Sequence, residues 1–223
     1  MWFIWYGVII ERNIWSYSRD VKKDSFEIKK EEETVDKFAV IDTETNWNDE
    51  VMSIGVVVAD SQTRKEIDSV YYIFDPEYKV GGMFSYELRI DEENACIASR
   101  KQALKEIKEW LAAYGVKKLF AYNASFDKKH LPECSGYEWY DIMRLAAYRQ
   151  YNSAIPNSAE CFKTGRLKRG YSVENVLKML RKNNWYSETH NAVLDARDEL
   201  EIMRLLGYGI EEYGIAFVTG KKL

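Results

Sequence analysis

The sequence predicts a mixed α/β domain, in which helices flank one sheet of antiparallel and parallel strands. Three apolar segments, residues 38–43, 52–59 and 69–74, follow one another with short connections, which is typical of an antiparallel meander. Helical and strand patterns alternate after the meander, which indicates further strands in the same sheet and helices on its faces. A chain of 223 residues suits one domain with a single core and an extension.

The elements after the meander are predicted from periodicity and from residues that cap helices. Residues 100–114 (RKQALKEIKEWLAAY) carry apolar side chains at helical spacing, and a short strand follows at 118–122. We expect Ser125 to cap a short helix that contains Asp127. A longer helix is expected to begin near Asp141, with that aspartate as its N-cap.

Two further helices are predicted near the end of the chain. One covers residues 173–181 and is capped by Ser172. The other covers residues 192–206 and ends at Gly207. Both have one apolar face, so we expect them to pack on the sheet.

Residues 1–36 lie outside this pattern. Two aromatic-rich segments, residues 2–10 and 14–18, could form a hairpin, and the charged residues 29–37 indicate a connector. The extension is either an accessory hairpin that covers a sheet edge or a partner-binding flap. The chain is therefore divided into three parts: the extension at 1–36, the folded domain at 37–208 and a C-terminal tail at 209–223.

Charge and cysteine content narrow the class of protein. Lys and Arg total 32 against 36 for Asp and Glu, which argues against a protein coated on duplex nucleic acid but permits an enzyme that touches a few phosphates. The three cysteines are widely spaced without a CxxC pair, which favours reduced thiols in the cytoplasm over disulfides or a zinc site. The apolar opening MWFIWYGVII is too short to span a bilayer and lacks a secretion signal's basic start, so we expect no membrane association.

The first functional signal is a pair of acids at the end of a predicted strand, in the stretch FAVIDTETNW. Asp42 and Glu44 are two residues apart, so their side chains point to the same face of the strand. Like charges in a poorly solvated place repel and raise each other's pKa. A positive partner is therefore expected beside them.

Two more acids are predicted to point inward. On the helix at 192–206, Asp195 shares a face with Ile202 and Leu206, the face that should pack on the sheet. Asp127 follows the strand at 118–122, where its alternative role is a favourable interaction with a helix dipole. Unpaired carboxylates in a core are costly, because each loses its hydration.

Divalent cations would explain these acids. Oxygen ligands without a His/Cys cluster suit Mg²⁺ or Mn²⁺ better than zinc. Two such ions, ~4 Å apart, stabilise both the attacking and the leaving oxygen of a phosphoryl displacement, so phosphodiester hydrolysis is expected. His190 precedes Asp195 by five residues and could take the proton of the attacking water; its alternative role is a helix-capping or exposed histidine.

In order and spacing these residues resemble the DEDDh family of 3′-to-5′ exonucleases, whose fold is shared by polymerase proofreading subunits. The family's DxE motif matches residues 42–44, its Asn and Phe-Asp motif matches residues 123–127, and its HxAxxDA motif matches residues 190–196. The sister DEDDy group has a tyrosine where this chain has Asn191, which favours the histidine group. The resemblance covers residues 37–207.

The resemblance implies a ribonuclease-H-like fold with a mixed, five-stranded sheet. It also implies two bound Mg²⁺ or Mn²⁺ ions, a histidine base at His190, and release of nucleoside 5′-monophosphates from the 3′ end of single-stranded or frayed DNA. RNA trimming, as in oligoribonuclease, is one alternative, and an inactive module that binds nucleic-acid ends or a protein is another. The matching metal ligands are Asp42, Glu44, Asp127 and Asp195.

Expected substrate contacts lie beside these motifs. Asn46 and Trp47 stand where many relatives have Thr-Gly, so Trp47 either stacks on the last base or covers the sheet edge. The stretch CFKTGRLKRGY is either a phosphate-binding patch or a solvated loop. The expected partner is a single-stranded 3′ end, and a homodimer is left open. The candidate substrate residues are Thr45, Asn46, Trp47, Asn123, Phe126, Lys163, Arg166, Lys168 and Arg169.

Overall fold

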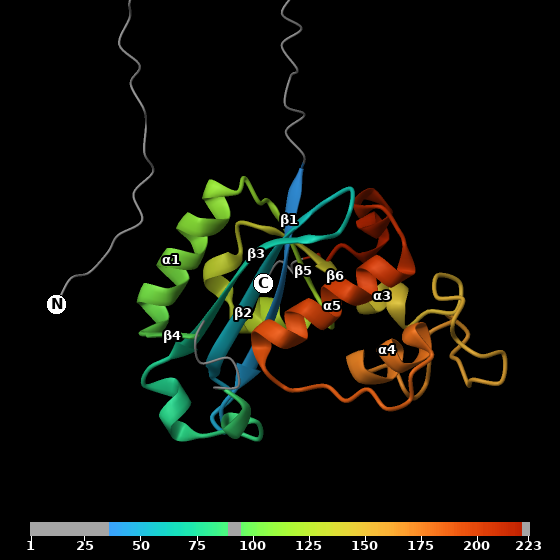
Figure 1. The fold of residues 1–223 in the computed structure, drawn as a ribbon, viewed down its shortest axis with the longest axis horizontal. Coiled ribbons are helices and arrows are strands. Elements are labelled where there is room, and N and C mark those ends of the chain that lie inside the picture. The colour runs from blue at the N-terminus through green and yellow to red at the C-terminus, as the bar shows by residue number, and fades with distance from the viewer. Residues whose placement is uncertain (1–35, 89–94, 220–223) are drawn as a thin grey trace, which may run out of the picture. The chain divides into compact units, whose positions relative to one another are not determined.

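A six-stranded sheet forms the centre of the computed structural model, which describes residues 36–88 and 95–219 (Figure 1). The strand order is β4-β3-β2-β1-β5-β6. β2 runs antiparallel to both β1 and β3, whereas β1–β5, β5–β6 and β3–β4 are parallel pairs. The strands are β1 (Lys37–Thr45), β2 (Val51–Asp60), β3 (Glu66–Phe74), β4 (Ala95–Ala98), β5 (Lys118–Ala121) and β6 (Glu138–Asp141). The hairpin predicted at residues 2–10 and 14–18 lies outside the described residues.

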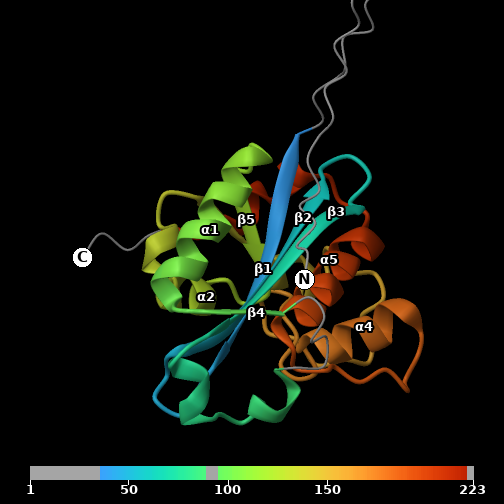
Figure 2. The same ribbon diagram turned by 60° about the vertical axis from the view of Figure 1, so that its left-hand side comes forward.

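Helices cover both faces of the sheet (Figures 1 and 2). α1 (Arg100–Ala113) packs on one face, and α5 (Ala192–Leu206) packs on the other with α4 (Val173–Arg181) beside it. No helix in residues 36–88 and 95–219 is long and apolar enough to cross a membrane. The remaining helices are short: α2 (Ser125–His130), α3 (Met143–Ala146), η1 (Glu77–Val80), η2 (Ser85–Glu87), η3 (Pro132–Cys134) and η4 (Ile210–Ala216).

The residues of β1 alternate between two cores, and this alternation orients the acids at its end. Ile41 lies in the core beneath α1, whereas Val40 lies in the core beneath α5. Side chains alternate along a strand with a period of two, so Asp42 and Glu44 continue the α5 side. Asp42 and Glu44 therefore face α5, the helix that carries Asp195.

A close approach of α5 to β2 holds the start of that helix against the sheet. A Cβ atom on Gly55 would lie 2.2 Å from the backbone nitrogen of Val193 and 2.3 Å from the carbonyl of Ala192. Any larger residue would collide with helix backbone, so glycine is required here for space. Asp195, in the first turn of α5, is thereby brought to the end of β1.

Most predicted elements are confirmed. The three strands of the meander, α1, α4 and α5 are present, with ends close to the predicted ones. The Ser172 side chain accepts a hydrogen bond from the backbone N–H of Asn175 and so caps α4. Gly207 ends α5 in a left-handed conformation, with φ of 79°.

Three predictions were wrong. The helix expected from Asp141 is preceded by a strand, β6, which ends at Asp141, and α3 has only four residues. Burial of Trp139 and Tyr140 in the sheet, paired with β5, outweighs the helical pattern. Ser125 is the first residue of α2 and does not cap it, because Ala124 holds the cap position. The sheet has six strands instead of five, because β4 adds to the edge at β3.

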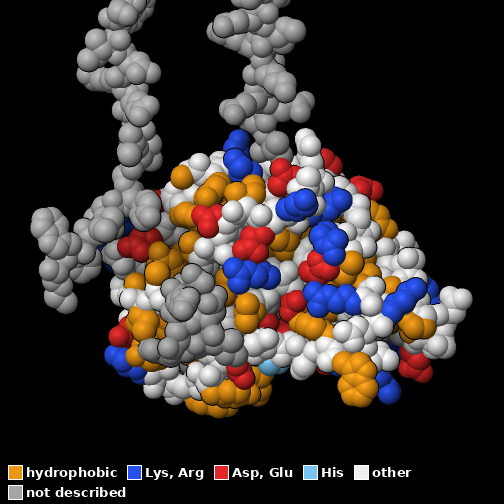
Figure 3. Space-filling model, viewed as in Figure 1, with side chains coloured by type: hydrophobic (Ala, Val, Ile, Leu, Met, Phe, Trp, Pro, Cys, Tyr) orange, Lys and Arg blue, Asp and Glu red, His pale blue; other side chains and the backbone are white. Residues whose placement is uncertain are grey.

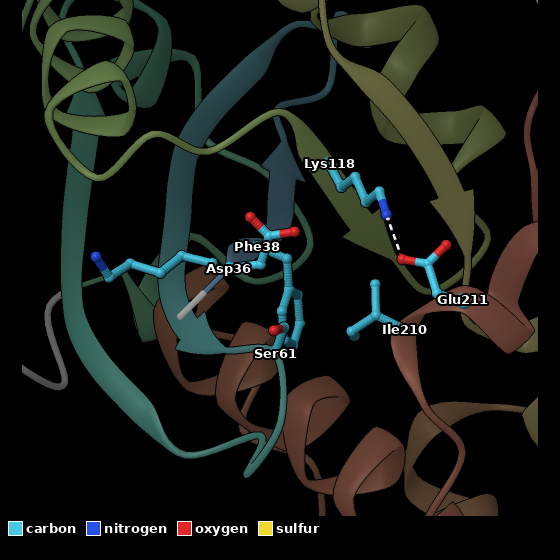
Figure 4. A pocket seen from close by; sticks show the side chains of 7 residues that line it. Asp36, Phe38, Ser61, Lys118, Ile210 and Glu211 are labelled. Atoms are coloured by element: carbon cyan, nitrogen blue, oxygen red, sulfur yellow. Dashed lines mark hydrogen bonds and ion pairs between the residues drawn. The ribbon is translucent and has the colours of Figure 1, made fainter. Parts of the chain in front are cut away.

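The segment predicted as a C-terminal tail begins with part of the folded domain. Tyr213 of η4 is completely buried, and Ile210 and Ala216 are nearly so. Beside η4, a cavity of 180 Å³ opens at the start of β1 (Figure 4). The ion pair between Lys118 and Glu211 lies on its wall, with 2.9 Å between the charged atoms. Since the acids lie at the other end of β1, this cavity is separate from them.

Candidate active site

Four acids from three parts of the chain meet where β1 ends and α5 begins, and we call them the acid cluster. Electrostatic interactions link Asp42 to each of the other three. The ligand atoms of Glu44, Asp195 and His190 all lie within 4.8 Å of one another. The acid cluster consists of Asp42, Glu44, Asp127 and Asp195. The structure therefore brings together all five residues that the sequence motifs single out.

Burial and mutual repulsion raise the pKa of every member of the acid cluster. Burial raises the pKa of Glu44 to about 8, with further contributions from Glu188 and Asp127. Burial also raises the pKa of Asp195 to about 8 and the pKa of Asp127 to about 7. Burial and four neighbouring carboxylates raise the pKa of Asp42 well above its usual range. Within the described ranges no Lys or Arg forms an ion pair with these acids.

The carboxylate oxygens of the acid cluster are suitable ligands for a divalent metal ion. Asp195 is only 3% exposed, and its Oδ1 has no hydrogen-bond partner among residues 36–88 and 95–219. An unpaired oxygen buried at this depth is costly unless a cation or donor compensates it. Carboxylate oxygens make up most of the donor set, which suits Mg²⁺ or Mn²⁺.

Asp127 is oriented by a residue inside the first motif. It lies in α2, directly after β5, and its Oδ1 accepts a hydrogen bond of 2.8 Å from Thr43 Oγ1. Thr43 stands between the two acids of β1 and points to the opposite side, because neighbouring side chains alternate. The sequence motif contains this residue, but only the structure assigns it a partner.

His190 lies just before α5 with a left-handed backbone, at φ of 59°. Its imidazole stacks on the ring of Phe84, with 3.8 Å between ring centroids and 15° between ring planes. Burial lowers the pKa of His190, although Glu174 and Glu87 oppose the change. Sequence analysis missed Phe84, because nothing in the sequence links the β3–β4 connection to the third motif.

Two further acids belong to the surroundings of the acid cluster. Glu199 is 2% exposed and lies four residues after Asp195, on the same side of α5. Glu188, two residues before His190, is half-buried, and burial raises its pKa to about 7. The helical spacing of Glu199 was visible in the sequence, whereas Glu188 lies in a loop that carries no periodic signal.

A hollow of 320 Å³ opens beside Glu44. Its wall includes Trp47 and, from the β3–β4 connection, Met83 and Phe84. The Trp47 side chain is 67% exposed, so it covers little of the sheet edge. Figure 3 shows hydrophobic side chains along the lower edge of the molecule, where Figure 1 places that connection, and Met83 and Tyr86 are among the exposed ones.

The other candidate substrate residues of the first two motifs differ in how exposed their side chains are to a substrate. Thr45 is half-buried and borders the hollow. The buried Asn46 amide bonds to Glu77 and Glu50 and to backbone N–H groups of its own turn, which argues against a substrate contact. Asn123 is exposed, with φ of 62°. Phe126 is 38% exposed and lies on the ring of His130.

The basic residues of the 160–171 loop lie between α3 and α4. The Arg166 guanidinium stands over the rings of Phe162 and Tyr171, at 5.3 and 5.1 Å from their centroids. Tyr122, which interacts electrostatically with Glu199, donates its hydroxyl to the carbonyl of Tyr171, so the loop reaches the edge of the site. Within residues 36–88 and 95–219, the exposed Lys163, Lys168 and Arg169 make no ion pair.

Solved exonuclease structures are similar to this fold. The nuclease domain of 3′hExo, a DEDDh family member bound to rAMP, matches with a TM-score of 0.54 and 15% identity, over 85% of this chain and 98% of that chain. A 3′-exonuclease that recognises the 3′ end of a histone mRNA stem-loop matches with a TM-score of 0.55 and 16% identity, over 77% and 64% of the two chains. The zinc-bound E. coli ExoI–ssDNA complex matches with a TM-score of 0.53 and 13% identity, over 76% and 40%.

These likenesses concern the fold. No protein-family model matches the sequence, and no curated protein matches it either. The structural matches confirm the predicted fold, a mixed sheet of antiparallel and parallel strands flanked by helices, as one that these exonucleases share. The roles of individual residues depend on the geometry of the acid cluster and its surroundings.

Proposed function

We propose that this chain is a metal-dependent 3′-to-5′ exonuclease, which releases nucleoside 5′-monophosphates from the 3′ end of single-stranded or frayed DNA. The observation that carries the proposal is the convergence of four inward carboxylates beside His190, with which no Lys or Arg of residues 36–88 and 95–219 forms an ion pair. A structural core has no use for such an arrangement, since each unpaired charge is costly there. The similarity to exonuclease folds supports the same proposal.

The proposed hydrolysis depends on the metal-ligating oxygens of the acid cluster and on His190. The acid cluster would hold two Mg²⁺ or Mn²⁺ ions, which supply positive charge to the attacking and leaving oxygens of the scissile phosphate. His190 takes the proton of the attacking water at an imidazole nitrogen, and its lowered pKa keeps the imidazole neutral and ready to accept. Stacking on Phe84 restricts the rotation of the ring. Thr43 fixes the carboxylate of Asp127 through its hydrogen bond.

The terminal nucleotide lies in the hollow beside Glu44. Trp47 and Phe84 offer aromatic faces there, and every base has a face that stacks on such rings. Phe126, which is 38% exposed and precedes Asp127 in α2, offers another aromatic face. The preceding phosphates then follow the basic loop, where Lys163, Arg166, Lys168 and Arg169 supply charge. Thr45 and Asn123 border the same path.

RNA is the second candidate substrate, and one observation favours it. Among the similar structures, 3′hExo is bound to rAMP, and a 3′-exonuclease is bound to an mRNA stem-loop, whereas ExoI is bound to single-stranded DNA. The fold therefore serves enzymes of either polymer. Contacts with the 2′ position decide between them.

The test is hydrolysis of 5′-labelled single-stranded DNA and RNA of one sequence, with Mg²⁺, Mn²⁺ or EDTA. We expect a product ladder that shortens stepwise from the 3′ end, stops in EDTA and advances faster on DNA. The variant Asp195→Asn should be inactive, whereas Glu201→Gln, on the same helix at a surface ion pair, should be fully active. Faster loss of RNA would establish the second candidate. Binding without metal-dependent hydrolysis by the wild type would indicate an inactive end-binding module.

We also propose that the protein works in the cytoplasm, with nucleic acid as its partner. Cys96, Cys134 and Cys161 are all free thiols, which is what a reducing compartment maintains. Cell fractionation with an antibody against the chain tests the location. Recovery in an oxidising, extracytoplasmic fraction would contradict it.

A further inference from the structure

Glu199 occupies a position that the matched motifs leave unassigned. It lies one helical turn after Asp195 on α5, so both carboxylates project from the same side of the helix. The helix packs that side on β1 and β2. Among the carboxylates around Asp42, Glu199 interacts with it most strongly, and Asp127 is the carboxylate that interacts most strongly with Glu199. Glu199 therefore lies on the side of the acid cluster formed by β1 and α2.

The surroundings of Glu199 provide one donor and leave one oxygen without a partner. The side chain is 2% exposed, and the backbone N–H of Tyr122 donates to its carboxylate. The Oε2 atom is buried and has no hydrogen-bond partner in the part of the chain that the structure describes. Within the described ranges, Glu199 makes no ion pair with Lys, Arg or His.

A structural role does not explain this residue. A glutamate that served packing alone would be better replaced by leucine or methionine, because a buried charge without a partner destabilises the fold. A glutamate that only held the Tyr122 backbone would need one oxygen, and glutamine would supply it. The second, unpartnered oxygen points instead to a cation among the neighbouring carboxylates.

We propose that Glu199 is a fifth carboxylate of the metal centre, acting on the divalent ion at the side of Asp42 and Asp127. The inference deepens the proposed function, since it assumes that the acid cluster binds metal. Its carboxylate either contacts the ion or holds a water molecule bound to it; in both cases the negative charge raises metal affinity. Charge is the property that the test must isolate.

The variant Glu199→Gln isolates charge, because it keeps the size of the side chain and an oxygen for Tyr122. Mn²⁺ binding to the full chain is measured by titration calorimetry, and thermal unfolding is measured in EDTA and in Mn²⁺. We expect Mn²⁺ affinity to fall by about 10- to 100-fold. In EDTA, the variant should unfold at a higher temperature than the wild type, because a buried charge is gone. The gain in unfolding temperature on adding Mn²⁺ should shrink.

Two further variants make the result decisive. Glu201→Gln removes a carboxylate of the same helix that pairs with Arg204 at the surface, and it should bind Mn²⁺ like the wild type. Glu199→Asp keeps the charge on a shorter side chain, so its affinity should lie between those of wild type and Glu199→Gln. If Glu199→Gln does not fold, Glu199→Asp tests the position of the carboxylate instead, and an Mn²⁺ affinity equal to that of the wild type would contradict the inference.

The outcomes separate this inference from the proposed function. If the wild type binds Mn²⁺ and Glu199→Gln binds it equally well, Glu199 has no part in the metal centre and the inference is wrong. A lower unfolding temperature of Glu199→Gln in EDTA, with unchanged affinity, would show a structural role instead. A wild type that binds no Mn²⁺ at all would contradict the metal centre itself, and with it the proposed nuclease chemistry.

Discussion

At the scale of single residues, the members of the site are held in different ways. Asp127 is fixed by a hydrogen bond from Thr43, His190 is fixed by stacking on Phe84, and Asp195 keeps one buried oxygen without a partner. The first two contacts restrict orientation, whereas the third leaves a place for a cation. Substitutions of the ring pair therefore test positioning separately from metal binding.

The variant His190→Ala tests the proposed base. Turnover should fall by about 10² to 10⁴-fold, as expected for the loss of a general base, while substrate KM changes little. Steady-state kinetics on the preferred polymer measures both quantities. An unchanged kcat would remove His190 from the mechanism.

The variant Phe84→Ala tests the ring that supports His190. Loss of the stacking partner frees the imidazole, and misplacement of a reacting group costs up to about 10²-fold in kcat. Met83→Ala is the matched control, since Met83 lines the same hollow, is 63% exposed and carries no aromatic ring that could stack on His190. If both variants lose kcat equally, the hollow as a whole is responsible and the stacking has no separate effect.

At the scale of elements, the position of α5 decides whether the acids meet. The helix can begin close to β2 only because Gly55 has no side chain, and the opposing atoms are backbone, which cannot rotate away. The elements that carry the acids are otherwise unremarkable strands and helices. Their spacing is the feature that creates the site.

The variant Gly55→Ala should displace the start of α5. A Cβ 2.2 Å from the backbone nitrogen of Val193 forces a shift, and overpacking of this kind costs about 1–3 kcal/mol of unfolding free energy. The rate of hydrolysis should fall strongly even if the protein stays folded, because Asp195 moves with the helix. Denaturant unfolding and hydrolysis measure the two effects. Gly136→Ala, where an added Cβ meets nothing within 4 Å, should match the wild type in both.

The 160–171 loop is the element proposed to follow the phosphates. The double variant Lys168→Ala, Arg169→Ala should weaken DNA binding and reduce the slope of log affinity against log salt by about 1 for each lost phosphate contact, with kcat unchanged. Lys101→Ala, Lys105→Ala is the control, since both lysines lie on α1, on the other side of the sheet. An equal loss of DNA affinity in both double variants would indicate unspecific attraction of DNA to positive charge.

At the scale of the whole molecule, the raised pKa values link stability to pH and to metal. In the folded chain the pKa values of Glu44 and Asp195 are about 8 and that of Asp127 is about 7, above the ordinary values of 4.5 for Glu and 3.8 for Asp. The folded protein without metal therefore binds protons that the unfolded chain has lost. This contribution to stability is complete below the ordinary values and is lost as pH rises through 7 and 8.

Thermal unfolding across this pH range tests the link. In EDTA the unfolding temperature should fall as pH rises from 6 to about 9, because the acids of the cluster then carry uncompensated charge. In Mn²⁺ the metal replaces the protons, so its stabilising effect should grow with pH. In EDTA, the unfolding temperature of the variant Asp195→Asn should fall less than that of the wild type over the same pH range. An unfolding temperature in EDTA that increases over this range would contradict the assigned pKa directions.

Sequence patterns within single segments were enough to predict many of the helices and strands. Periodicity located the meander, α1, α4 and α5, and the five residues of the three motifs were identified before their proximity was known. Hydrophobic period and capping are local in sequence, so one segment displays them without help from another. Strands β4 and β6 were missed, because these short segments carry no clear strand pattern of their own and are strands through pairing with β3 and β5.

The fold class and the inward direction of the acids were predictable from the sequence, since strand alternation and helical spacing decide which side chains point inward. The contacts between side chains from distant segments became known only from the folded structure. Phe84 stacks on His190 from the β3–β4 connection, and the Asn46 amide donates to the carbonyl of Glu77. Glu199 is buried, and its Oε2 has no hydrogen-bond partner among the described residues. Each of these facts depends on contacts between distant segments, which chain packing creates and no local pattern encodes.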